Sequence, residues 1–197
     1  MRTAPIRTAQ IERKTRETDI ALSLKLDGNG TSNVTTGVGF FDHMLELLTV
    51  HSGIDINLSC KGDLQVDAHH TVEDVGIALG DCIRQALGDK KGIARFADRL
   101  VPMDETAAQV AVDFSGRSAL IFPNELSGKV GNFDMELIEE FLRAFASHAG
   151  CNLYVKILST GNRHHMAEAI FKALALCIRD AVRVVSDKVP SSKGMLE

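Results

Sequence analysis

The chain has 197 residues, 45% of them hydrophobic, which is enough to fold around a core as one domain or two small ones. A formal net charge of −4 and the lack of any Lys/Arg run exclude the basic surface that nucleic-acid binding requires. No apolar stretch is long enough to span a bilayer, and the N-terminal residues lack a signal-peptide core, so we expect no membrane partner and a cytoplasmic location.

The first half of the chain predicts two strands followed by an alternation of helices and strands. Polar and apolar residues alternate over 5–14 and 18–26, which indicates strands, and the Gly-rich stretch 27–39 indicates a loop. A helix over 40–51 is expected to end at Gly53 as a left-handed cap, before a strand over 54–60. A second helix is expected over 69–87, closed by Gly88.

The second half repeats this order of elements. Strands are expected over 93–101 and 106–114, with a short one at 119–122. A helix over 134–148, a strand over 152–158 and a helix over about 163–186 follow.

This order predicts an α+β fold that is internally duplicated as strand-strand-helix-strand-helix. The half-repeats are expected at 1–92 and 93–197 and should together form one compact catalytic unit. We expect two four-stranded mixed sheets with the helices packed between or beside them.

Matching motifs support the duplication. His-Ser-Gly at 51–53 matches His-Ala-Gly at 148–150, and each precedes a predicted strand. Eight residues before these motifs, His43 and Glu140 stand at equivalent positions. Both residue types can bind a metal ion.

A pair of histidines followed by a glutamate occurs once in each half, at 69–73 (HHTVE) and 164–168 (HHMAE). On an α-helix the two histidines diverge by about 100° and the glutamate lies between them. Neighbouring histidines therefore cannot easily bind one ion, but two such helices facing each other could lend one histidine to each of two ions. Asp42 and Asp74 are candidates to orient the imidazoles, although such residues are more often helix caps or solvated charges.

With His43 and Glu140, these motifs supply enough side chains for two four-ligand metal sites. Imidazole and carboxylate without thiolate favour Mn, Fe, Co or Zn over a structural thiolate zinc site. The four cysteines form no Cys-x-x-Cys pair and are expected to be buried thiols. The candidate ligands are His43, His69, His70, Glu73, Glu140, His164, His165 and Glu168.

Basic residues and small Ser/Gly segments outside these motifs could hold a phosphate. Arg and Lys bind phosphate oxygens through charge-assisted hydrogen bonds, and Ser/Gly segments let backbone N–H groups approach. Taken singly, each such residue is more often a solvated surface charge, and the sequence alone does not bring them together. The candidates are Arg95, Arg117, Lys172, Ser192 and Lys193.

Four longer motifs resemble those of the imidazoleglycerol-phosphate dehydratases of histidine biosynthesis. They are FFDHML at 40–45, DAHHTVEDVGIALG at 67–80, NRHH at 162–165 with EAIFKAL at 168–174, and PSSKG at 190–194. The resemblance runs from about Arg13 to the C-terminus and is carried by long motifs in the same order.

The resemblance implies a manganese-dependent hydro-lyase that converts D-erythro-imidazole glycerol phosphate into imidazole acetol phosphate. It implies two Mn²⁺ per active site, with one ion held by His43, His70, His164 and Glu168 and the other by His69, Glu73, Glu140 and His165. Some family members have His in place of Glu140, which makes that ligand the least secure of the set.

The resemblance also implies how the substrate is handled. No carbonyl activates the C2 proton, so the ring must act: metals on both ring nitrogens favour imidazolate, which can expel the C3 hydroxyl to give a diazafulvene-like intermediate. The implied catalytic residues are Glu17, for proton transfer, together with His43, His70 and Glu168. The implied substrate and phosphate contacts are Glu17, Arg95, Arg117, Lys172, Ser192 and Lys193. We expect His51 to contact the substrate or to have a structural role, and His148 to be structural.

Finally, the resemblance implies a homo-oligomer of 24 subunits with active sites between subunits. The residues alone do not exclude two other classes of function. A dinuclear hydrolase would use the same ligand types, although Asp-rich ligand sets are more usual there. A metal-storage or structural protein would need the ligands but not the phosphate-binding residues, and the HExxH motif of metallopeptidases is absent.

Overall fold

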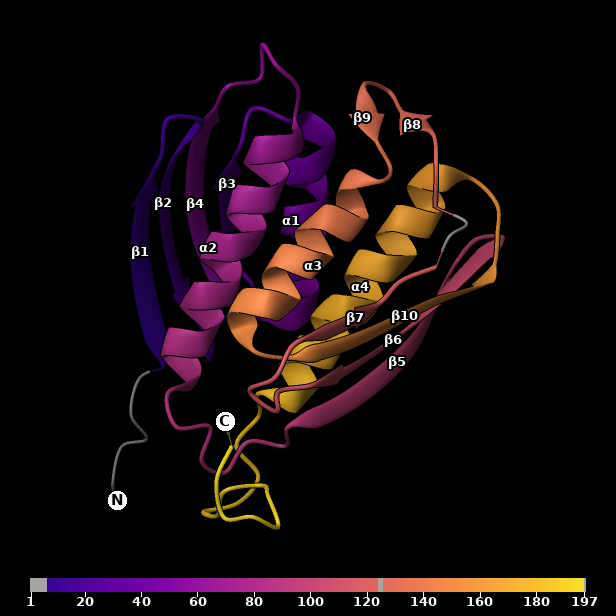
Figure 1. The fold of residues 1–197 in the computed structure, drawn as a ribbon. Helices are drawn as coiled ribbons and strands as arrows, with labels where there is room; N and C mark the ends of the chain where they lie inside the picture. The colour runs from indigo at the N-terminus through magenta and orange to yellow at the C-terminus, as the bar shows by residue number, and fades with distance from the viewer. Residues whose placement is uncertain (1–6, 124–125, 197) are drawn as a thin grey trace.

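A layer of helices lies between two sheets in the computed structural model, which describes residues 7–123 and 126–196 (Figure 1). The first sheet has the order β1-β2-β4-β3 and the second β5-β6-β10-β7. In each sheet the first three strands pair antiparallel and the last pairs parallel to its neighbour. The expected pair of four-stranded mixed sheets is therefore confirmed.

The first half contributes β1 (Thr8–Lys14), β2 (Thr18–Lys25), β3 (Ser32–Thr35), α1 (Gly39–Ser52), β4 (Asp55–Gly62) and α2 (His69–Leu87). The second half contributes β5 (Phe96–Met103), β6 (Thr106–Asp113), β7 (Ala119–Ile121), α3 (Leu137–Ala149), β10 (Asn152–Ser159) and α4 (Arg163–Ala181). A small hairpin, β8 (Lys129–Val130) and β9 (Phe133–Asp134), precedes α3. Within the described residues, no helix is long and apolar enough to cross a membrane.

Two strand regions were not predicted from the sequence. The segment expected to be a loop contains β3, in which only Val34 packs against the core, so its apolar pattern is too short to recognise. The hairpin β8–β9 was also missed. Positions 5 and 6 of the first expected strand lie outside the described residues.

The last helix ends at Ala181, five residues earlier than expected. The following segment pairs with the chain before β5: Ala94 N–H donates to Arg183 O at 2.9 Å, and Val185 N–H donates to Gly92 O at 2.8 Å. The β-branched Val184 and Val185 favour this extended pairing over further helix.

The core forms where the inward faces of both sheets meet the helices. Alternate residues of the central strands are buried, among them Leu22 on β2 and Val110 on β6. All four cysteines are buried and unpaired, as expected, and burial raises the pKa of Cys82 and Cys177 to about 12. They serve as core residues.

Glycines bring α2 and α3 into close contact. A Cβ atom built on Gly80 would lie 2.7 Å from Phe145 O and 2.8 Å from Ala149 N, both of them backbone atoms of the facing helix. Replacing Gly80 with Ala should therefore push the helices apart and lower the free energy of unfolding by about 1–3 kcal/mol, as overpacking does. Urea unfolding measures the change. Gly39→Ala is the matched control because its Cβ would meet nothing within 4 Å; equal stability of both variants would contradict the packing argument.

Candidate metal centre

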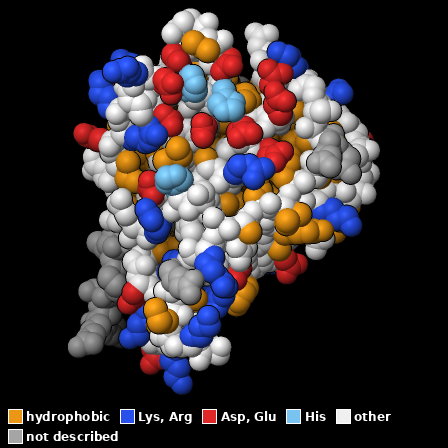
Figure 2. Space-filling view, in the orientation of Figure 1, with side chains coloured by type: hydrophobic (Ala, Val, Ile, Leu, Met, Phe, Trp, Pro, Cys, Tyr) orange, Lys and Arg blue, Asp and Glu red, His pale blue; other side chains and the backbone are white. Residues whose placement is uncertain are grey.

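The four helices begin at the same end of the molecule, around a groove of about 820 Å³. The groove is lined by the first residues of α1, α2, α3 and α4 and by the β8–β9 hairpin, and it includes His43, His69 and His164. Figure 2 shows histidines and acidic side chains together in the upper part of this face. The histidines of the two halves therefore gather at one end of the helical layer.

Local capping places both histidine pairs in the first turn of a helix. Asp67 Oδ1 accepts a hydrogen bond from His69 N–H at 2.7 Å, and Asn162 Oδ1 accepts one from His164 N–H at 2.9 Å. An Asp or Asn two residues before the first histidine thus starts each helix in the same way. Both residues, Asp67 and Asn162, belong to the sequence motifs that resemble those of the dehydratase family.

Three candidate ligands converge on one point of the groove. His43 Nε2 and His164 Nε2 lie 3.1 and 3.0 Å from the same oxygen, Glu168 Oε1. Lys172 Nζ donates to the other carboxylate oxygen, Oε2, at 2.6 Å. One ligand atom from each of His43, His164 and Glu168 lies within 4.8 Å of the others, as an ion bound by all three would require.

Electrostatics keep this carboxylate ionised. Burial would raise the pKa of Glu168, but hydrogen bonds from Lys172, His43 and His164 outweigh it and hold the pKa at about 2. Two imidazole nitrogens beside an ionised carboxylate form a donor set that fits a divalent ion such as Mn²⁺. His43, His164 and Glu168 therefore fit a divalent ion of the kind that the family resemblance implies, as far as one chain supplies the ligands.

His70 does not join this group. Its Nδ1 lies 3.0 Å from Asp63 Oδ2, and its Nε2 lies 3.7 Å from Glu17 Oε1. The hydrogen bond with Asp63 raises the pKa of His70. Its neighbour His69 faces Glu73, with 3.8 Å between His69 Nε2 and Glu73 Oε2.

The remaining candidate ligands are also separate within one chain. His165 Nδ1 lies 2.9 Å from Glu105 Oε2, whereas Asp104 Oδ2 lies 3.8 Å from the same nitrogen and its side chain is 70% exposed. Glu140 is half-buried in α3 and is not part of the group formed by His43, His164 and Glu168. The expected facing of the two histidine-bearing helices does not occur inside one chain, because α2 packs mainly on α3, and α4 on α1.

Neither Asp42 nor Asp74 pairs with an imidazole in the part of the chain that the structure describes. Asp42 Oδ1 accepts from Thr36 N–H and from Thr36 Oγ1, which holds the loop before α1. Asp74 Oδ2 accepts from Arg13 and from Thr18 Oγ1, which ties α2 to the first sheet. The carboxylates behind the imidazoles are instead Asp63 and Glu105, which sequence reasoning missed.

Most candidate phosphate ligands meet in a small pocket of about 190 Å³. It is lined by Arg95, Ser115, Arg117, Ser191, Ser192, Lys193, Met195 and Leu196. Lys172 is not among them, because it bonds to Glu168. Lys172 therefore belongs to the histidine groove, whereas Arg95, Arg117 and Lys193 belong to this pocket.

The arginines of this pocket differ in their partners. Arg95 donates to both carboxylate oxygens of Asp113, at 2.7 and 3.1 Å, and to Pro190 O at 2.8 Å, so it holds the C-terminal segment in place. In the part of the chain that the structure describes, the side chains of Arg117 and Lys193 have no carboxylate partner. Arg117 and Lys193 are therefore the cations of this pocket that can bind an anion such as a phosphate.

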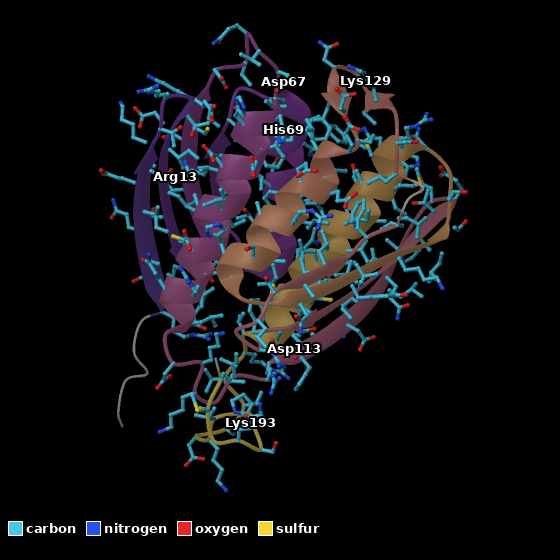
Figure 3. All side chains as sticks on the ribbon, viewed as in Figure 1. Arg13, Asp67, His69, Asp113, Lys129 and Lys193 are labelled. Atoms are coloured by element: carbon cyan, nitrogen blue, oxygen red, sulfur yellow. The ribbon has the colours of Figure 1, made fainter. Side chains whose placement is uncertain are left out.

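The phosphate-type pocket lies at the opposite end of the helical layer from the histidine groove. Arg95 N–H donates to Ala181 O at the end of α4, whereas His164 lies at its beginning. The 19-residue helix separates the two by about 25 Å. Figure 3 shows the same arrangement, with His69 at the upper end of the helices and Lys193 at the lower end.

The other two histidines lie in the last turns of their helices. His148 Nδ1 lies 3.2 Å from Asp81 Oδ1 and links α3 to α2. His51 lies in the last turn of α1, where burial and then the charge of Lys172 lower its pKa.

Comparisons with known proteins agree with these observations. The sequence model of the family described as imidazoleglycerol-phosphate dehydratase matches residues 36–178. The chain is 54% identical over 195 residues to the imidazoleglycerol-phosphate dehydratase of Rhodopseudomonas palustris (strain HaA2), covering 97% of this chain and 99% of the relative. It is 53% identical over 193 residues to the enzyme of that name from Acetivibrio thermocellus, covering 96% and 99%.

Two solved structures share the fold. The crystal structure of imidazoleglycerol-phosphate dehydratase from Staphylococcus aureus subsp. aureus N315 matches with a TM-score of 0.82 and 40% identity, over 90% of this chain and 99% of that one. The enzyme from Pyrococcus furiosus, in complex with (S)-C348, matches with a TM-score of 0.83 and 32% identity, over 94% and 100%.

Proposed function

The chain belongs to the imidazoleglycerol-phosphate dehydratase family and is a dehydratase, and we propose that it removes water from D-erythro-imidazole glycerol phosphate at a two-manganese site. The product would be imidazole acetol phosphate, an intermediate of histidine biosynthesis. A cytoplasmic location, as the sequence predicts, suits an enzyme of small-molecule biosynthesis.

The observation that carries the proposal is the distance between the histidine groove and the phosphate-type pocket. In the substrate, only three carbon atoms join the imidazole ring to the phosphate, which is a span of less than about 10 Å. One chain cannot hold both ends of this molecule across about 25 Å of helix. We therefore propose that the groove of one copy and the pocket of another form each active site.

The incomplete ligand groups support the same assembly. His43, His164 and Glu168 give three of four ligands, and His70 of another copy would supply the fourth. In the same way, His69 and Glu73 of one copy would face Glu140 and His165 of another. Metal binding and association of copies would then depend on each other, in line with an assembly of 24 subunits.

Each group would have a distinct task in the reaction. A divalent ion at each ring nitrogen, when bound, would stabilise the deprotonated ring, the form that can expel the neighbouring hydroxyl. Glu17, close to His70 Nε2, would take the proton from C2. Lys172 would keep Glu168 ionised, and Arg117, Ser192 and Lys193 would grip the phosphate, with Arg95 shaping the pocket.

The test is to incubate metal-stripped protein with the substrate, with and without Mn²⁺, and to follow the ketone product by its absorbance in alkali. Ketone formation that depends on Mn²⁺ supports the proposal. Release of inorganic phosphate would favour a dinuclear hydrolase instead, and tightly bound metal without any product would favour a metal-storage protein.

Replacing Arg117 with Ala should raise KM for the substrate by about 10- to 100-fold, because the phosphate loses a charge-assisted hydrogen bond. Stability should change little, since no described carboxylate depends on this side chain. Steady-state kinetics and urea unfolding measure the two effects. Arg95→Ala is the matched comparison: it should reduce stability as well, because Asp113 loses its partner. An unchanged KM for Arg117→Ala would show that the pocket does not bind the phosphate.

A further inference from the structure

The second histidine of each pair has a carboxylate behind it. Asp63 Oδ1 and Oδ2 lie 3.2 and 3.0 Å from His70 Nδ1, and Glu105 Oε2 lies 2.9 Å from His165 Nδ1. An ionised carboxylate can only accept hydrogen bonds, so Nδ1 of each ring must carry the hydrogen. The Nε2 atom of each ring then carries no hydrogen, and its lone pair can bind a metal ion.

The two carboxylates do not stand at equivalent positions in the duplicated fold. Asp63 directly follows β4, just before α2. The corresponding segment after β10, residues 160–162, is Thr-Gly-Asn and contains no carboxylate. In the second half, the acceptor comes instead from Glu105, in the turn between β5 and β6. The same hydrogen bond to the histidine Nδ1 is thus made by carboxylates from parts of the chain that do not correspond in the two halves. This indicates that the histidine needs the acceptor, and that the contact was not simply copied when the fold was duplicated.

Hydrogen bonds with backbone groups hold both acceptor residues in the fold. Asp63 N–H donates to Glu17 O at 3.0 Å, and Asp63 O accepts from Val66 N–H at 2.8 Å. Glu105 Oε1 accepts from Asn162 N–H at 2.6 Å, and Asn162 is the residue that caps α4. The main chain of Asp63 and the carboxylate of Glu105 are therefore tied to the fold by contacts that involve no metal ion.

We propose that Asp63 and Glu105 are positioning residues that fix the tautomer and orientation of His70 and His165, so that Nε2 of each ring is the metal-binding atom. The inference rests on the proposed two-metal function. Because His70 and His165 would bind different ions, Asp63 should act on one ion and Glu105 on the other. Carboxylates behind metal-bound histidines commonly have this effect on affinity.

The first test is a titration of the metal-free full chain with Mn²⁺, with free Mn²⁺ measured by electron paramagnetic resonance. Wild type should show two sites per chain. Asp63→Ala should weaken one of them by about 10- to 100-fold, and Glu105→Ala should weaken the other to a similar extent. Asp63→Asn should lose less affinity than Asp63→Ala, because the amide oxygen can still accept from Nδ1.

Asp104→Asn is the matched control. Asp104 neighbours Glu105 and carries the same charge, but its Oδ2 lies 3.8 Å from His165 Nδ1, beyond hydrogen-bond distance, and its side chain is 70% exposed. Asn also tolerates the positive φ of 48° at this position. Affinity for both ions should stay as in wild type; a loss equal to that of Glu105→Ala would mean that nearby charge alone is responsible, and would overturn the proposal.

The second readout is the ¹⁵N spectrum of sedimented, metal-free protein labelled at histidine. The rings of His70 and His165 are expected to carry hydrogen on Nδ1 in wild type, as is that of His148 beside Asp81. The His70 signal should be lost in Asp63→Ala and the His165 signal in Glu105→Ala, whereas the His148 signal should stay in both. Unchanged spectra and unchanged Mn²⁺ affinities in both Ala variants would refute the positioning role. If wild type itself binds no Mn²⁺, the proposed function fails, whereas the spectra still decide whether the hydrogen bonds set the tautomers.

Discussion

Replacing His164 with Ala is expected to reduce the rate of dehydration by at least about 10³-fold. Bound metal contributes several kcal/mol of charge stabilisation to reactions of this kind, and 4.1 kcal/mol corresponds to about 10³ in rate. His164 Nε2 lies 3.0 Å from Glu168 Oε1, at the centre of the only described group that combines two histidines with a carboxylate. Its loss leaves His43 and Glu168 without a third ligand from the same chain.

Activity and Mn²⁺ content should be measured together for this variant. His148→Ala is the control, because it also removes an imidazole from a helix but one that pairs with Asp81, away from the groove. It should retain activity within a few-fold of wild type. Full activity and full metal content of the His164 variant would mean that the groove is not a metal centre.

Replacing Asp74 with Ala is expected to cause the largest loss of stability, about 3 kcal/mol in the free energy of unfolding. Asp74 Oδ2 accepts from Arg13 at 2.9 Å and from Thr18, and only 9% of the Asp74 side chain is exposed. Breaking a buried pair by removing one partner costs about 3–5 kcal/mol, and the lower value applies because 29% of the Arg13 side chain remains exposed.

Urea unfolding at matched chain concentration measures this loss, because association of copies also adds to stability. Asp19→Ala is the control: it breaks a pair with Lys14 in which the two side chains are 54% and 76% exposed, and it should cost less than about 1 kcal/mol. If both variants unfold at the same urea concentration, Asp74 does not tie α2 to the first sheet.

Local patterns predicted most of the fold. The helix over 69–87 agrees with α2 at both ends, because its apolar spacing and the closing Gly88 are local features of the sequence. The end of α1 at Gly53 was also predicted, and Gly53 has the left-handed conformation expected of such a cap, with φ of 73°. The end of α4 was not, since it depends on pairing with Gly92, a residue far away in the chain.

The candidate site shows the same difference between local features, which the sequence reveals, and contacts between distant residues, which it does not. The histidine pairs were recognisable because their spacing on a helix is a local property. The carboxylates behind them were not: Glu105 is 60 residues from His165, and only the folded chain brings the two together. The sequence likewise could not reveal that α2 packs on α3 rather than facing α4, although this arrangement makes one chain insufficient for the proposed site.

The central claim is that each active site is completed by residues of different copies, and mixed assemblies of two inactive variants test it most directly. His70→Ala removes the ligand that another copy would lend, and His164→Ala removes one from the local group. If the two are combined in equal amounts and assembled with Mn²⁺, about a quarter of the sites should take both ligands from intact positions and regain activity. Activity no higher than that of the separate variants would contradict the claim, since it would place both histidines in a site formed within one chain.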